Sequence, residues 1–145
     1  MASCRVARVS IDPDRLRVLP LFASLSDAEL ERLGRAFEAK QVSPGAHLTL
    51  EGASGYSFFV IESGTVRVER DGQLLKTLSD GDFFGEAAIL TGERRNATVT
   101  AASDVELLVL FGTEFRVLEA ELPETAERIR AKMLERANEP LPGTT

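Results

Sequence analysis

The chain has 145 residues, a length typical of one compact domain. Hydrophobic residues make up 43% and charged residues 28%, which allows a packed core and excludes wholesale disorder. The formal net charge of −6 argues against a general nucleic-acid-binding protein. An anionic ligand would therefore have to be attracted by a local site.

Neither secretion nor membrane insertion is indicated by the sequence. The single cysteine, Cys4, excludes an internal disulfide, and no apolar run approaches the roughly 20 residues of a membrane span. The first ten residues contain Arg5 and Arg8 but no continuous apolar stretch, so they do not resemble a signal peptide. We expect a cytoplasmic protein with no membrane or nucleic-acid partner.

The N-terminal part is predicted to be helical. Asp12 and Pro13 are typical of an N-cap and a first helical position. Ser26 followed by Glu29 is typical of a capping box, in which each residue satisfies a backbone amide of the other. The apolar stripe of this second helix continues to Phe37.

The middle of the chain is predicted to form strands. Asp71-Gly72, between two alternating apolar runs, predicts a tight hairpin. Many short strands broken by glycine are typical of a sandwich, jelly roll or barrel. The expected strands lie at 47–50, 57–61, 65–69, 97–101 and 105–110.

The C-terminal part is again predicted to be helical. Thr113 is the expected N-cap of one helix, and Pro123 is expected to break it or to start the next. Apolar residues follow helical spacing in both helices. They are Phe115, Leu118 and Leu122 in the first, and Ala126, Ile129, Met133 and Ala137 in the second.

The segment from Gly81 to Val99 carries the chemistry. Gly85 permits an unusual backbone conformation, and the next residues can form one helical turn whose free amides favour an anion. Arg94 and Arg95 then supply positive charge just before a strand. These features fit a site for one phosphate; the alternative is a β-barrel corner with ordinary surface charges.

The same residues resemble a known motif. Phe84-Gly85-Glu86, Ile89, Arg95 and Ala97-Thr98-Val99 are similar to the phosphate-binding cassette of cyclic nucleotide-binding domains. That family includes the regulatory subunits of cAMP-dependent protein kinase and the catabolite activator protein. The resemblance extends over about residues 18–138.

The resemblance implies a mainly β fold of the α+β class, an eight-stranded β-roll or jelly roll with N-terminal helices and C-terminal lid helices. The cassette would occupy residues 84–99 of one nucleotide-binding domain, 12–138. The other predicted boundaries are an N-terminal extension (1–11), N-terminal helices (12–38), the β-roll (39–111), C-terminal helices (113–138) and a tail (139–145).

The resemblance also implies roles for individual residues. Arg95 would pair with the exocyclic phosphate oxygens, and Glu86 would accept from the ribose 2′-hydroxyl. Gly85 would let the backbone approach the ligand. The implied ligand contacts are Phe84, Gly85, Glu86, Ala87, Ala88, Arg95, Asn96 and Ala97, with Ile129 and Met133 as lid contacts to the base. Those two residues equally fit packing on the β-roll or on a second copy.

The ligand favoured by the resemblance is cAMP, with cGMP left open. Family members that prefer cGMP often carry threonine after the cassette arginine, those that prefer cAMP often carry alanine, and this chain has Asn96. No metal and no other cofactor is expected.

We expect a stand-alone sensor that signals to an unknown effector protein. A homodimer formed through the C-terminal helix is one possibility. An enzyme is disfavoured because the chain has one histidine, His47, and no nucleophile–base pattern. The remaining alternative is a degenerate module that keeps the fold and acts only in protein–protein interaction.

Overall fold

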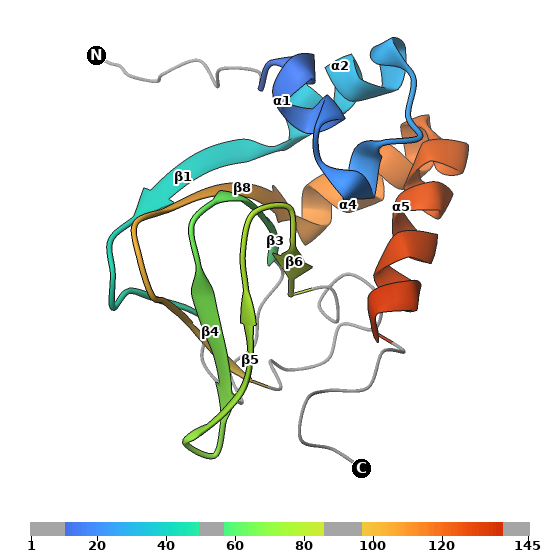
Figure 1. The fold of residues 1–145 in the computed structure, drawn as a ribbon. Coiled ribbons are helices and arrows are strands. Elements are labelled where there is room, and N and C mark those ends of the chain that lie inside the picture. The colour runs from blue at the N-terminus through green and yellow to red at the C-terminus, as the bar shows by residue number, and fades with distance from the viewer. Residues whose placement is uncertain (1–10, 50–56, 86–96, 138–145) are drawn as a thin grey trace.

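The computed structural model describes residues 11–49, 57–85 and 97–137, shown as coloured ribbon in Figure 1. Within these residues, eight antiparallel strands form two four-stranded sheets, and helices gather on one side of them. Sheet 1 has the order β1 (Glu38–Val42), β8 (Val105–Phe111), β3 (Ser57–Ser63), β6 (Phe83–Phe84). Sheet 2 has the order β2 (His47–Thr49), β7 (Thr98–Ala101), β4 (Val66–Arg70), β5 (Gln73–Leu78). The predicted β-roll with flanking helices is confirmed.

Sheet 1 is the middle layer of the molecule. Phe58 and Val60 of β3 belong to a core cluster shared with the helices, which we call the helical core. Phe59 and Ile61, the alternate residues of the same strand, belong to a second cluster shared with sheet 2, which we call the intersheet core. Successive side chains of a strand point to opposite faces, so an apolar run is required where both faces are covered.

The β4–β5 hairpin follows the predicted turn. Asp71 and Gly72 both have positive φ, at 53° and 78°, and Arg70 pairs with Gln73 across the turn. Two consecutive residues with positive φ make the type I′ turn, whose twist matches that of the adjoining strands. The sequence pair Asp-Gly therefore fixes the pairing next to the turn, where Arg70 faces Gln73 and Glu69 faces Leu74.

The N-terminal helices begin as predicted. Asp12 caps α1 (Pro13–Arg17) by accepting from the backbone N–H of Asp14 at 2.9 Å. At α2 (Asp27–Ala36), the Ser26 hydroxyl accepts from the Glu29 N–H at 3.2 Å and the Glu29 carboxylate accepts from the Ser26 N–H at 2.8 Å. Helix α2 ends one residue before Phe37, which is buried and leads directly into β1. A short 3₁₀ helix, η1 (Pro20–Phe22), connects α1 to α2.

One helix start differs from the prediction. The N-cap of helix α4 (Gly112–Glu121) is Phe111 rather than Thr113, and it makes no side-chain capping hydrogen bond. The reason is that β8 continues to Phe111, which still pairs with Ser57, so the helix begins at the next residue. Helix α5 (Pro123–Ala137) starts at the predicted proline.

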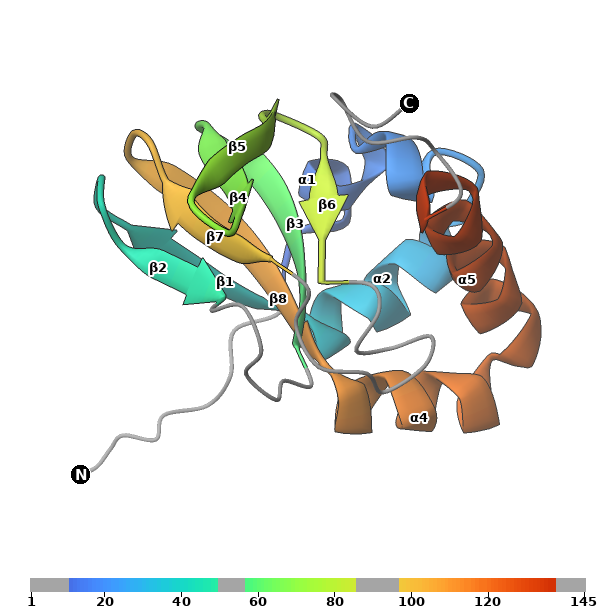
Figure 2. The same ribbon diagram turned by 90° about the horizontal axis from the view of Figure 1, so that it is seen from below.

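The helices cover the face of sheet 1 that sheet 2 leaves free. Figure 2 shows α2 and α5 on one side of β3, with β4, β5 and β7 on the other. Ala126, Ile129 and Met133 of α5 are buried in the helical core. Among the described helices, none combines the length and hydropathy needed to cross a membrane.

Candidate nucleotide-binding site

The predicted cassette leaves sheet 1 at β6. Phe84 is buried, and its ring stacks on Phe59 with centroids 4.8 Å apart and planes 11° from parallel. Gly85 follows with φ of 86°, a backbone conformation that residues other than glycine adopt only with steric strain. The stacked ring therefore holds the strand end in place while Gly85 turns the chain out of the sheet.

The cassette enters sheet 2 at β7. Ala97 and Val99 are buried, and they belong to the intersheet core together with Phe84. Both ends of the segment are thus packed into one core, although they belong to different sheets. Of the predicted contacts, Phe84 and Ala97 share this core, and Gly85 follows Phe84 directly in the chain. The predicted contacts Glu86, Ala87, Ala88, Arg95 and Asn96 lie outside the described residues.

A rigid turn precedes β6. The Ile61 N–H donates to the Asp82 carbonyl at 2.8 Å, and the Gly81 N–H donates to the Ile61 carbonyl at 2.8 Å. The Asp82 carboxylate accepts from the Ser79 N–H at 2.9 Å. Gly81 has φ of 87°, and a Cβ there would lie 3.2 Å from the ring of Pro20 in η1. The turn at Gly81 and Asp82 thus also brings η1 close to the start of the cassette.

The predicted lid residues occupy the helical core. Ile129 and Met133 are 1% and 0% exposed and share this core with Phe83. Phe83 and Phe84 are adjacent on β6 and point to opposite faces of sheet 1. Strand β6 therefore links the core that holds both cassette ends to the core that holds α5.

Glu29 has a second role that sequence reasoning missed. Besides capping α2, its carboxylate accepts from the Thr125 hydroxyl and from the Arg128 guanidinium of α5, the latter at 3.0 and 3.1 Å. Burial acts to raise the pKa of Glu29, but the hydrogen bonds from Ser26, Thr125 and Arg128 together lower it to about 2. The capping box was visible in the sequence. The contact to α5, nearly one hundred residues away, had no local signal.

Two further ion pairs fix the α4–α5 corner. The Arg32 guanidinium of α2 contacts the Glu121 carboxylate at 2.7 Å. Arg130 of α5 pairs with Glu119 of α4, and its guanidinium carbon lies 5.4 Å from the centre of the Phe115 ring. Together with the contact between Glu29 and Arg128, these pairs join α2, α4 and α5 to one another.

A polar groove of about 590 Å³ lies between α1 and strands β1, β3 and β8. Its Arg15 guanidinium pairs with Glu62, at 2.8 Å for one of the two contacts, and this hydrogen bond raises the pKa of Arg15. Gln41 donates to Glu106 at 3.0 Å. None of the residues that line it is a predicted ligand contact, so we do not assign the nucleotide to this groove.

Within the described residues, no group of three or more His, Cys, Asp or Glu side chains is arranged to hold a metal ion. The His47 Nδ1 lies 3.0 Å from the hydroxyl of the buried Thr100, which gives this histidine a polar partner across strands.

The family profile described as "Cyclic nucleotide-binding domain" matches residues 39–121, more than half of the chain. The chain belongs to this family. The match spans all eight strands except the first residue of β1, as well as α4, and it includes the whole cassette.

Relatives of the chain include channels, kinase regulatory subunits and a cGMP-dependent protein kinase. A cyclic nucleotide-gated potassium channel of Rhizobium etli is 39% identical over 84% of this chain and 34% of its own length. A cAMP-dependent protein kinase regulatory subunit of Yarrowia lipolytica is 35% identical over 66% of this chain and 26% of its own length. The chain thus spans about a third or less of these relatives.

The fold is also that of solved cyclic nucleotide-binding domains. The regulatory domain of Toxoplasma gondii protein kinase A, crystallised with cAMP, superposes with a TM-score of 0.72. The superposition covers 85% of this chain and 48% of that chain, at 22% identity. At this identity the likeness establishes the fold.

Proposed function

We propose that this chain is a sensor that binds cAMP through residues 84–99 and transmits binding to a partner protein through its C-terminal helices. The observation that carries the proposal is the anchoring of both cassette ends in the intersheet core, with Gly85 in a left-handed conformation. Family membership and the cAMP-dependent relatives support the choice of ligand.

The proposed contacts follow the family motif. Arg95 pairs with the exocyclic oxygens of the cyclic phosphate, and Glu86 accepts from the ribose 2′-hydroxyl. The backbone amides of Ala87 and Ala88, with the region of Asn96, complete the phosphate cradle. The charge of the protein is negative overall, so this local cradle has to supply the attraction.

In this proposal β6 transmits ligand binding from the cassette to α5. A ligand that tightens the cassette acts on Gly85 and Phe84, and Phe83 passes the displacement to the helical core that contains Ile129 and Met133. Such a ligand biases a two-state equilibrium of α5 by its differential affinity for the two states. In this proposal Ile129 and Met133 act by packing α5 into the helical core, and contact with the base is not required.

The test is thermal unfolding with saturating cAMP, with cGMP, and with linear 5′-AMP as the control ligand. A ligand at 100 times its Kd stabilises the folded state by about 2.7 kcal/mol. For a chain of this size that raises the Tm by roughly 5–10 °C. No shift with either cyclic nucleotide would refute the sensor and favour the degenerate interaction module.

A paired substitution tests the cassette itself. Arg95→Ala removes the cation proposed to face the phosphate and should weaken cAMP binding by about 3 kcal/mol or more, which exceeds 100-fold in Kd. Arg94→Ala is the matched control, because it removes a neighbouring cation that the motif does not use. Equal effects of the two substitutions on the Kd would refute the assignment of Arg95.

A further inference from the structure

Strand β1 forms one edge of sheet 1. Within the described ranges, β8 is the strand that pairs with it, and no strand follows on its other side. Such an edge presents a row of backbone N–H and C=O groups without a strand partner. Ala39, Lys40 and Gln41 are exposed one after another. Because successive side chains of a strand point to opposite faces, both faces of β1 are accessible as well as its edge.

The polar groove lies beside this edge. Gln41 of β1 and Glu106 of β8 stand opposite each other and line it. Ala39 lies two residues before Gln41 on the same face, and its short side chain leaves the groove open toward the edge. Lys40 also borders the groove, but it stands opposite Leu107 of the intersheet core. Directly opposed residues share a face of the sheet, so the Lys40 side chain belongs to the other face of β1.

The groove has an excess of negative charge. The guanidinium of Arg15 is already paired with Glu62, whose side chain is 13% exposed. That hydrogen bond is the main cause that raises the pKa of Arg15, and the charges of Glu106 and Asp12 raise it further. One guanidinium therefore faces three carboxylates, which leaves the groove attractive to additional cations.

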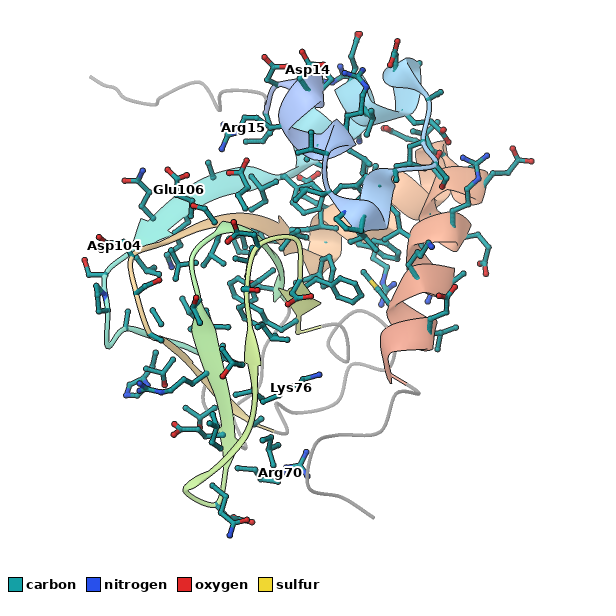
Figure 3. All side chains as sticks on the ribbon, viewed as in Figure 1. Asp14, Arg15, Arg70, Lys76, Asp104 and Glu106 are labelled. Atoms are coloured by element: carbon teal, nitrogen blue, oxygen red, sulfur yellow. The ribbon has the colours of Figure 1, made fainter. Side chains whose placement is uncertain are left out.

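Glu106 is the carboxylate that a ligand can use. It accepts from the Gln41 amide at 3.0 Å and from the Ser63 hydroxyl at 3.3 Å, both of which are neutral donors. None of the ion pairs among the described residues involves Glu106, which is exposed. A carboxylate can accept about four hydrogen bonds, so capacity for a cation remains. Asp104, two residues earlier, is also exposed, and Figure 3 shows Arg15, Glu106 and Asp104 on the side of the molecule where β1 lies.

An open strand edge beside an acidic groove suits one kind of partner. An extended segment can pair its backbone with the edge while its alternate side chains occupy adjacent pockets. The negative charge favours cationic side chains at those positions and disfavours a nucleic acid or an anionic membrane. We propose that β1 and this groove bind an extended segment of a partner protein that carries arginine or lysine at alternate positions.

The spacing of the strands permits this contact. Neighbouring strands lie about 4.8 Å apart, so a strand added to β1 lies about 10 Å from β8. An extended arginine or lysine side chain and the Glu106 side chain together span that distance. Lys40 faces the other side of the added strand and repels a cation there, so the cations have to alternate with neutral or acidic residues. The segment is therefore recognised by its pattern as well as by its charge.

The test uses the intact chain without nucleotide, so its outcome does not depend on the proposed cAMP site. The probe is a short fluorescent peptide in which arginine alternates with valine, and its Kd is measured by fluorescence anisotropy at low salt. Glu106→Gln keeps the shape of the side chain but removes its charge, and it should raise this Kd about fivefold. Glu124→Gln is the matched control, because it removes an exposed charge from α5, outside the groove, and should leave the Kd unchanged.

Two further measurements separate docking on β1 from general attraction. Binding should slow amide hydrogen exchange at residues 38–42, and a peptide with glutamate in place of arginine should not bind. The proposal is wrong if the arginine peptide does not bind, if exchange in β1 is unchanged, or if Glu106→Gln and Glu124→Gln have equal effects. Equally tight binding of a threonine–valine peptide would also overturn it, because the acidic groove would then play no part. Thermal unfolding checks each variant, and Asp104→Asn replaces Glu106→Gln if the latter is unfolded.

Discussion

The contact between Glu29 and α5 makes a quantitative prediction about stability. Glu29→Gln keeps the shape of the side chain but removes the charge that Arg128 and the first turn of α5 face. The pKa of Glu29 is lowered from 4.5 to about 2, which corresponds to roughly 3 kcal/mol at 1.36 kcal/mol per unit. The side chain remains 17% exposed, so we expect a loss of about 2 kcal/mol at pH 7.

The same contact predicts a dependence on pH. A carboxylate whose folded-state pKa is depressed stabilises the protein fully above its unfolded pKa, near 4.5, and loses this contribution as the pH falls toward 2. The free energies of unfolding of wild type and Glu29→Gln should therefore differ at pH 7 and converge between about pH 5 and pH 2. Urea unfolding at a series of pH values measures both.

A control on the same helix isolates the effect. Glu31→Gln removes an exposed charge from α2 and should change the free energy of unfolding by no more than about 0.5 kcal/mol. The reasoning would be refuted if Glu29→Gln behaved like Glu31→Gln at pH 7. A difference that persisted unchanged at the lowest pH would also refute it, because the charge would then not be its source.

Four further substitutions test the packing, each by urea unfolding at pH 7. Helix propensity alone predicts that Gly34→Ala raises the free energy of unfolding by about 1 kcal/mol. We expect a loss of about 1–2 kcal/mol instead, because the new Cβ would overlap the carbonyl oxygen of Ile11. A net gain in stability would contradict this. Gly64→Ala should lower the free energy of unfolding by more than about 2 kcal/mol, and Gly72→Ala by about 1 kcal/mol. Both glycines have positive φ, but only at Gly64 would a Cβ also overlap backbone atoms, those of Asp104 and Val105. Equal losses would show that backbone strain alone sets the cost. Met133→Ala should cost about 2–5 kcal/mol, and a loss below 1 would place its side chain outside the core.

Local signals in the sequence determined much of the fold. The capping box at Ser26, the Asp71-Gly72 turn and the proline that opens α5 each appear as predicted. Each depends on atoms a few residues apart, so the chain encodes it without reference to distant segments. The cassette motif was equally local, which is why family membership followed from the residues themselves.

Only the tertiary structure decided where those elements meet. Thr113 satisfies the rule for an N-cap, yet pairing of Phe111 with Ser57 fixes the start of α4 elsewhere. The strand at 65–69 was predicted, but only its register with β7 places Val68 opposite Val99 in the intersheet core. The sequence predicted Glu29 as part of a capping box, but its contact with Arg128 of α5 depends on the packing of the two ends of the chain. Contacts between segments so far apart depend on register and packing of the whole domain, which no local pattern records.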